Sequence, residues 1–205
     1  MPVNIRSTEG KLVWQTEGLE IDLLPLQGLW TEAQYLRLTD QTNRFIEFTD
    51  GYVEVLPMPT RKHQAISRFL FLAFLAFIQP RGGTVFYAPL RVRISAGRFR
   101  EPDLVLLLDV KDPRNQNAFW LGADLVVEIV SPDHMERDTS MKRIEYAAAG
   151  IPEYWIINPE EESITVLTLT DDHYVAHGIF RRGDTAVSPL LQGFTVSVDE
   201  VCNAE

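Results

Sequence analysis

The sequence is short of cysteine, of long apolar runs and of any leader segment. Its one cysteine, Cys202, can form neither an intrachain disulfide nor a cysteine-based zinc site. The longest apolar run covers residues 69–78, far below the ~20 residues that span a bilayer. Residues 1–10 lack the apolar core of a signal peptide. We therefore expect a cytoplasmic protein without a membrane segment.

Basic residues are also in deficit. Nineteen Lys and Arg stand against 29 Asp and Glu, for a formal net charge of −10. Such a chain repels polyanions as a whole, so any nucleic-acid site must be a local basic patch. With 205 residues, 45% of them hydrophobic, the chain can bury one sizeable core. We expect an N-terminal arm over residues 1–29 and a single domain over residues 30–205.

Local patterns predict alternating strands and helices. Thr31 and Gln34 form a capping-box pattern at the start of a helix, and Asp50-Gly51 predicts a hairpin turn. The other expected elements are a helix over residues 63–79, a hairpin of residues 84–94 and 99–109, a strand over 124–130, a helix over 138–149, and strands over 154–158, 164–169 and 174–180. These elements indicate an α/β or α+β fold with a mixed central sheet flanked by helices.

The expected helix over residues 63–79 is apolar on nearly every side. Such a helix is either central in the fold or packed on a second subunit. The second alternative would make the protein a homodimer, which could place two sites on opposite strands of a duplex.

Two acidic residues interrupt strands that are otherwise apolar. Asp103 begins the run DLVLLLD, and Glu128 lies inside LVVEIV. A lone carboxylate in such a strand is costly unless it is paired or bound to a cation. Two of them on neighbouring strands would form an oxygen-ligand site for Mg²⁺ or Mn²⁺, which suits phosphodiester hydrolysis.

Other roles for the two carboxylates stay open at this point. Asp103 could cap the turn formed by Glu101 and Pro102, while Glu128 could meet an arginine. The pair could also be the acid and base of a glycosidase, which would need a sugar-sized separation between them.

Pro102-Asp103, followed 25 residues later by Glu128, resembles the PD-(D/E)xK nuclease signature. The lysine of that signature falls on Val130 in this sequence. Lys142, in the next expected helix, is the candidate replacement. The alternative is that Lys142 forms an exposed helix pair with Asp138, which stabilises by only ~0.3–0.5 kcal/mol.

A longer pattern extends this likeness over roughly residues 30–190. It comprises EFTDG at 47–51, His63, Pro102-Asp103, LVVEIVSP at 125–132, Asp138, Lys142, YAAAG at 146–150 and EYW at 153–155. In this order the motifs resemble the Uma-two family of restriction-endonuclease-like proteins, in the PD-(D/E)xK superfamily. The sequence departs from the family at Tyr52, where an acidic residue is common.

The resemblance implies a restriction-endonuclease-like fold with an N-terminal β-hairpin elaboration. It further implies a divalent metal held by Asp103 and Glu128, with Lys142 as the migrated lysine. We add the backbone carbonyl of Ile129 as a candidate metal ligand. Glu47 matches the strand glutamate of the family and is either a third acidic wall of the site or a glutamate that faces water.

Basic residues near Asp103 are the candidates for contact with nucleic acid. Residues 81–100 contain no Asp or Glu, and their candidates are Arg91, Arg93, Arg98 and Arg100. A second group comprises Arg61, Lys62 and His63. Arginines on such a hairpin can contact successive phosphates of a nucleic acid. Arginines also occupy hairpin faces simply because those faces are solvated. His63 and His134 are weaker candidates for catalysis, because most such histidines cap or pack.

The sequence therefore predicts a Mg²⁺- or Mn²⁺-dependent endonuclease whose partner is nucleic acid, DNA before RNA. The alternative is a nuclease fold that no longer cleaves and serves as a binding or assembly module. The position of the Lys142 nitrogen discriminates between them: near the carboxylates it supports the enzyme, and in bulk solvent it supports the module.

Overall fold

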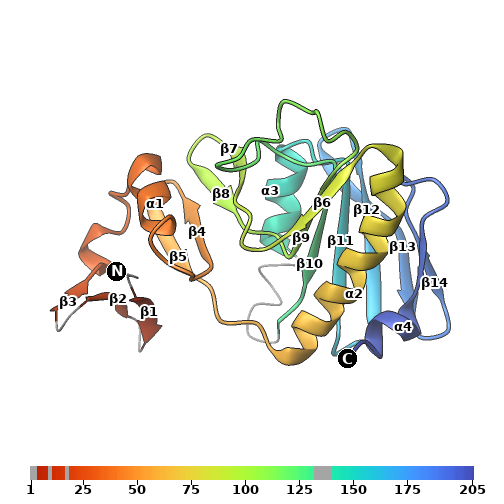
Figure 1. Ribbon diagram of the computed structural model, residues 1–205, viewed down its shortest axis with the longest axis horizontal. Coiled ribbons are helices and arrows are strands. Elements are labelled where there is room, and N and C mark those ends of the chain that lie inside the picture. The colour runs from red at the N-terminus through yellow and green to blue at the C-terminus, as the bar shows by residue number, and fades with distance from the viewer. Residues whose placement is uncertain (1–3, 9–10, 17–18, 132–139) are drawn as a thin grey trace. The chain divides into compact units, whose positions relative to one another are not determined.

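Two units make up the chain in the computed structural model, and each is described by itself (Figure 1). The first comprises Met1–Met58 and Ser95–Glu101, and the second comprises Pro59–Ile94 and Pro102–Glu205. The structure describes residues 4–8, 11–16, 19–131 and 140–205, with side chains from residue 22 onward. The expected boundary between residues 29 and 30 stays a prediction.

The first unit begins with a three-stranded antiparallel sheet. Its strands are β1 (Asn4–Thr8), β2 (Lys11–Thr16) and β3 (Leu19–Asp22), followed by the short 3₁₀ helix η1 (Leu24–Leu26). Helix α1 (Glu32–Thr39) carries the predicted capping box, in which the Thr31 amide donates to Gln34 Oε1 at 2.8 Å and the Gln34 amide donates to Thr31 Oγ1 at 3.3 Å. The predicted start of this helix is confirmed.

The predicted hairpin at Asp50-Gly51 is also confirmed. Strands β4 (Ile46–Thr49) and β5 (Tyr52–Val55) pair on either side of it, and β8 (Arg98–Arg100) pairs with the other edge of β4. Both turn residues have positive φ, 47° and 91°, as a tight hairpin turn requires. A Cβ on Gly51 would lie 2.6 Å from the carbonyl oxygen of Gly28, so a larger residue would separate the two backbones.

The second unit contains a six-stranded mixed sheet in the order β13-β12-β11-β10-β9-β6. Its parallel pair is β10 with β11, and the other neighbours are antiparallel. The strands are β6 (Thr84–Tyr87), β9 (Leu104–Leu107), β10 (Leu125–Ile129), β11 (Glu153–Asn158), β12 (Ser163–Thr170) and β13 (His173–Arg181). The mixed central sheet expected from the sequence is confirmed.

Each arm of the second expected hairpin is divided into two strands. The arm over residues 84–94 forms β6 and β7 (Val92–Ser95), and the arm over 99–109 forms β8 and β9. Pro89 follows β6 and Pro102 precedes β9. Because proline has no backbone N–H, neither position can continue a central ladder.

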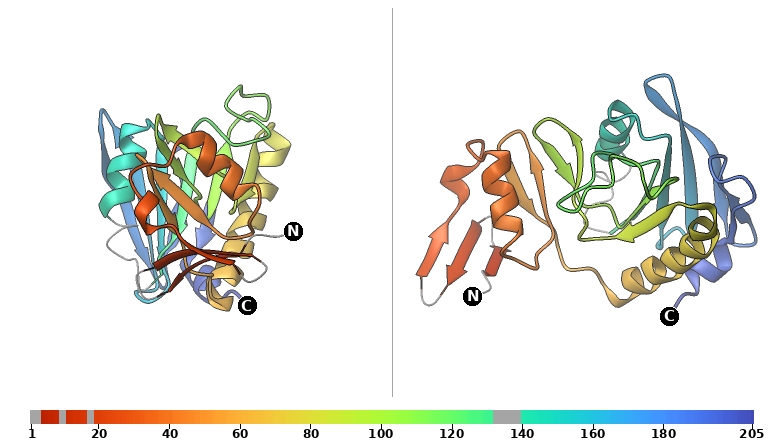
Figure 2. Two further views of the ribbon diagram at one scale, coloured as in Figure 1. Left: turned by 90° about the vertical axis from the view of Figure 1, so that its left-hand side faces the viewer. Right: turned by 45° about the horizontal axis from the view of Figure 1, so that its top comes forward.

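Helices cover both faces of the six-stranded sheet (Figure 2). One face packs against α2 (Arg61–Ile78) and α4 (Val198–Cys202), together with β14 (Thr185–Val187) and β15 (Thr195–Ser197). The other face packs against α3 (Lys142–Ala148). The 3₁₀ helix η2 (Gln79–Arg81) directly follows α2. Of the expected helix over residues 138–149, positions 138 and 139 lie outside the described residues.

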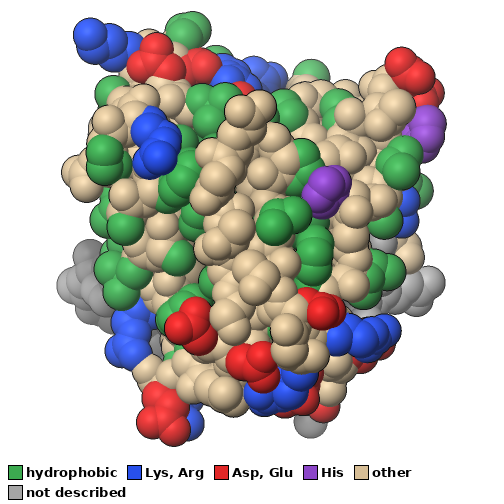
Figure 3. All heavy atoms as spheres, turned by 90° about the vertical axis from the view of Figure 1, so that its right-hand side faces the viewer, with side chains coloured by type: hydrophobic (Ala, Val, Ile, Leu, Met, Phe, Trp, Pro, Cys, Tyr) green, Lys and Arg blue, Asp and Glu red, His purple; other side chains and the backbone are tan. Residues whose placement is uncertain are grey.

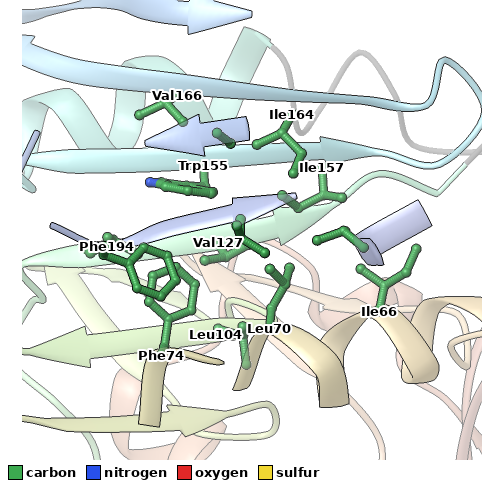
Figure 4. Close-up of a cluster of buried hydrophobic side chains, with 14 of the residues drawn as sticks. Ile66, Leu70, Phe74, Leu104, Val127, Trp155, Ile157, Ile164, Val166 and Phe194 are labelled. Carbon is green, nitrogen blue, oxygen red and sulfur yellow. The ribbon is translucent and has the colours of Figure 1, made fainter. Parts of the chain in front are cut away.

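Helix α2 covers one face of the sheet and exposes its other side, so it is not central in the second unit. Ile66, Leu70 and Phe74 are fully buried and face the sheet strands that carry Val127 and Trp155 (Figure 4). The Phe74 ring stacks on Phe194 with centroids 4.4 Å apart and meets Trp155 edge-on at 5.6 Å. Within the described part of the chain, no helix is long and apolar enough to cross a membrane.

Phe74→Ala will lower the free energy of unfolding by about 3–5 kcal/mol, because it removes a fully buried ring and leaves a cavity. Leu72→Ala is the matched control, since Leu72 lies on the same helix with a 55% exposed side chain, and it will change stability by no more than about 0.5 kcal/mol. Urea unfolding followed by tryptophan fluorescence measures both. Equal effects would contradict this description of the core.

Candidate active site

The pairing of β9 with β10 places the two predicted carboxylates near the same end of this strand pair. The antiparallel register pairs Leu106 with Leu125 and Leu104 with Val127. The paired positions end there, and Asp103 and Glu128 are the next residues beyond them on the two segments of the chain. Two residues that are 25 positions apart in sequence thus share one end of a strand pair.

The carboxylate of Asp103 is held by groups from two other elements. Its Oδ2 accepts a hydrogen bond of 2.7 Å from the amide of Ile129 in β10. Its Oδ1 lies 3.1 Å from Nε2 of His63 in the first turn of α2. The side chains of His63 and Asp103 are only 13% and 17% exposed, so this contact is shielded from water. The structure therefore places His63 beside a predicted metal ligand.

Glu128 is buried on β10 and meets α3. Its Oε1 lies 2.8 Å from Lys142 Nζ and accepts a hydrogen bond of 2.6 Å from the hydroxyl of Tyr146. The side chains of Lys142 and Glu128 are each 5% exposed. Lys142 therefore does not lie on an exposed helix face, and the alternative that paired it there is wrong. Asp138, its suggested partner, and His134 lie outside the described residues.

Val130, at the signature position of the lysine, is a core residue. It is 4% exposed and packs in the same hydrophobic cluster as Tyr146. The positive charge beside Glu128 comes instead from the first residue of α3. Tyr146 lies one turn further along α3 and also reaches Glu128. Sequence reasoning missed this contact, although Lys142 and Tyr146 share a helix face at i, i+4 spacing.

The donor set of Asp103 and Glu128 suits a hard divalent cation. Mg²⁺ binds oxygen ligands and commonly uses only one or two protein carboxylates, with water and substrate oxygens completing its shell. Among the residues that the structure describes, no group of three or more His, Cys, Asp or Glu side chains is arranged to hold a metal ion. A cation at this position would therefore need ligands besides protein side chains. The metal itself stays a prediction.

Glu47 lies in the first unit, on β4. Its side chain is 1% exposed, and it lies 3.6 Å from Nε of Arg100 and accepts from the amide of Glu101 at 3.3 Å. The alternative that Glu47 faces water is therefore wrong. The predicted acidic wall beside Asp103 stays a prediction.

The four predicted arginines of residues 81–100 occupy different environments. Arg100 is 4% exposed and donates to the carbonyl oxygens of Phe48 and Phe99, so it is buried within the first unit. Arg98, in the same unit, pairs with Asp50 at 2.9 Å. In the second unit, Arg91 donates to the carbonyl oxygen of Ala118 at 3.0 Å, and Arg93 lies on β7. Their contact with nucleic acid stays a prediction.

The basic residues at the start of α2 have unequal surroundings. Arg61 is exposed, whereas Lys62 Nζ donates to the carbonyl oxygens of Cys202 and Ala204. Lys62, on α2, thus connects this helix to the end of α4 by hydrogen bonds. On the side of the molecule where Figure 1 places β13 and β14, basic and acidic side chains are interspersed along one margin (Figure 3). Mixed charge of this kind weakens the attraction of that face for a polyanion.

Comparison with known proteins places the chain in a family. A family described as "Uma2: Putative restriction endonuclease" matches residues 32–199. The chain is also similar to the crystal structure of a putative nuclease belonging to DUF820 from Anabaena variabilis, with a TM-score of 0.64 and 22% sequence identity. That likeness covers 77% of this chain and 89% of the other and concerns the fold alone. No curated protein matches the sequence.

Lys142→Met will destabilise the second unit by about 3–5 kcal/mol, because removing one partner of a buried ion pair leaves the other charge uncompensated. The double variant Glu128→Gln/Lys142→Met will recover most of this loss, since the remaining amide is neutral. Urea unfolding of the wild type, both single variants and the double variant measures the coupling. A double variant as unstable as the sum of its single variants would show that the two side chains do not interact.

Proposed function

The chain belongs to the Uma2 family of putative restriction endonucleases, and from that membership and the contacts of Asp103, Glu128 and Lys142 we propose a divalent-metal-dependent endonuclease that hydrolyses phosphodiester bonds of DNA. One observation carries the proposal: Lys142 Nζ lies 2.8 Å from Glu128 Oε1, although the signature lysine is absent from β10. Two carboxylates can hold the cation, and a shielded lysine can stabilise negative charge on the phosphate. The lysine position favours the enzyme over a silent binding module.

Mg²⁺ or Mn²⁺ is the proposed cofactor. The carboxylates of Asp103 and Glu128 and the backbone carbonyl of Ile129 are its proposed protein ligands. When bound, such a cation supplies Lewis-acid polarisation of a phosphate and makes a nearby water more acidic. The hydrogen bond from the Ile129 amide to Asp103 supports this assignment, because it fixes one carboxylate next to the backbone of the strand that carries the other.

Lys142 supplies positive charge to the reacting phosphate. In hydrolysis, the oxygen of a water loses a proton and forms a bond to phosphorus, while the bond from phosphorus to one ester oxygen breaks and that oxygen leaves with a proton. Negative charge increases meanwhile on the non-bridging phosphate oxygens. An ammonium group in a shielded site stabilises such charge more strongly than one in water. Nζ can also orient the attacking water by a hydrogen bond. Its burial beside Glu128 supports both roles.

DNA is the proposed substrate and the cytoplasm the proposed location. Because the chain has a net charge of −10, DNA must bind at a local basic surface. The candidates for that surface in the second unit are Arg91, Arg93 and Arg61. Assembly as a homodimer stays a prediction. The sheet of the same chain covers one face of α2, the helix that suggested the dimer.

Asp103→Asn and Glu128→Gln will each lower cleavage of supercoiled plasmid by at least ~100-fold, because each removes charge from the proposed cation site. EDTA will abolish wild-type cleavage, and Mg²⁺ or Mn²⁺ will restore it. Asp171→Asn is the matched control. Asp171 is exposed with a φ of 56°, a conformation that asparagine also tolerates, so this variant will cleave like the wild type.

Wild-type rates in both site variants would refute the assignment of the site. A wild type that cleaves neither plasmid, single-stranded DNA nor RNA in either metal would instead favour the binding module. Binding of labelled duplex in a mobility-shift assay then tests that alternative directly.

A further inference from the structure

Tyr146 is the contact of Glu128 that the proposed function leaves without a role. Its hydroxyl donates to Glu128 Oε1 at 2.6 Å, the same oxygen that lies 2.8 Å from Lys142 Nζ. Two donors from successive turns of α3 thus meet on one oxygen of the carboxylate.

Two donors on a single oxygen fix the rotation of a carboxylate. The terminal torsion of a glutamate is broad and roughly two-fold, so an unrestrained carboxylate exchanges its two oxygens easily. The donors on Oε1 oppose this exchange, because it would separate both of them from their acceptor. A carboxylate that binds a cation is expected to depend on such supporting hydrogen bonds.

Tyr146 is itself rigidly placed. It is fully buried, and its ring meets that of Tyr154 edge-on with centroids 5.2 Å apart. The backbone carbonyl of Tyr146 accepts from the amide of Ile151 at 3.1 Å, which fixes the end of α3. The hydroxyl is therefore presented by a fixed ring, whereas Lys142 reaches the same oxygen through a flexible four-carbon chain.

We propose that Tyr146 is a positioning residue, whose hydroxyl holds Glu128 Oε1 so that the carboxylate keeps its orientation toward a divalent cation when Lys142 Nζ turns to the phosphate. This inference rests on the proposed function. It assigns the two donors different tasks: Tyr146 keeps Glu128 in place throughout the reaction, and Lys142 is shared between Glu128 and the substrate.

Tyr146→Phe tests the proposal, with Tyr174→Phe as the matched control. Tyr174 is buried in the same hydrophobic cluster, and its hydroxyl donates to the carbonyl oxygen of Ile151 at 2.7 Å. Burial also raises the pKa of Tyr174 above its ordinary value, so this hydroxyl stays protonated as a donor. Each variant therefore removes one buried tyrosine hydroxyl and its hydrogen bond, but only Tyr146→Phe takes a donor from Glu128.

Isothermal titration of the full chain with Mn²⁺ gives the direct readout. Tyr146→Phe will weaken Mn²⁺ binding about tenfold, whereas Tyr174→Phe will bind within twofold of the wild type. Both will lower Tm by a similar amount, about 2–4 °C, for the loss of one buried hydrogen bond. Saturating Mn²⁺ will return cleavage by Tyr146→Phe to within a few-fold of the wild-type rate, because the defect lies in cation binding.

Wild-type Mn²⁺ affinity in Tyr146→Phe overturns the positioning role while the proposed function stands. Equal weakening in the two variants also overturns it, since the effect would then follow from lost stability alone. A wild type that binds no Mn²⁺ overturns the metal-dependent function, and the positioning role with it.

Discussion

The site depends on how a buried negative charge on β10 is compensated. Removing a carboxylate from water costs several kcal/mol unless a cation and hydrogen-bond donors surround it. At Glu128 these partners are Lys142 Nζ and the Tyr146 hydroxyl, both from α3. The packing of α3 against the sheet therefore depends on the charge of Glu128 on β10. The same contacts bring a lysine to Glu128, although Val130, directly after β10, stands at the signature position of the lysine.

The register of two strands supplies the second constraint. Because β9 and β10 are antiparallel, Asp103 and Glu128 lie near the same end of the pair, and the Ile129 amide donates to Asp103. His63 approaches the same carboxylate from α2. Each carboxylate is thus held by a helix from a different face of the sheet. A slip of one residue in the register of β10 would turn Glu128 to the other face of the sheet, away from Lys142 and Tyr146.

Local chemistry made much of the fold predictable. The capping residues Thr31 and Gln34, the turn Asp50-Gly51 and the apolar pattern of α2 each correspond to an element of the structure. The interruption of the second hairpin was not foreseen, although Pro89 and Pro102 could have indicated it. Asp103, Glu128 and Lys142 stood out because a charge in an apolar pattern is conspicuous. Tyr146 did not, since a tyrosine in an expected helix is most simply a core residue, and its hydroxyl contact depends on tertiary packing. The burial of Arg100 with Glu47 was hidden for the same reason.

The central claim is that Asp103 and Glu128 together hold a divalent cation, and anomalous diffraction from crystals grown with Mn²⁺ tests it most directly. The account predicts an anomalous peak within coordination distance of one oxygen from each carboxylate, and its loss in Glu128→Gln. A peak at another site, or none between these carboxylates at saturating Mn²⁺, would contradict the account.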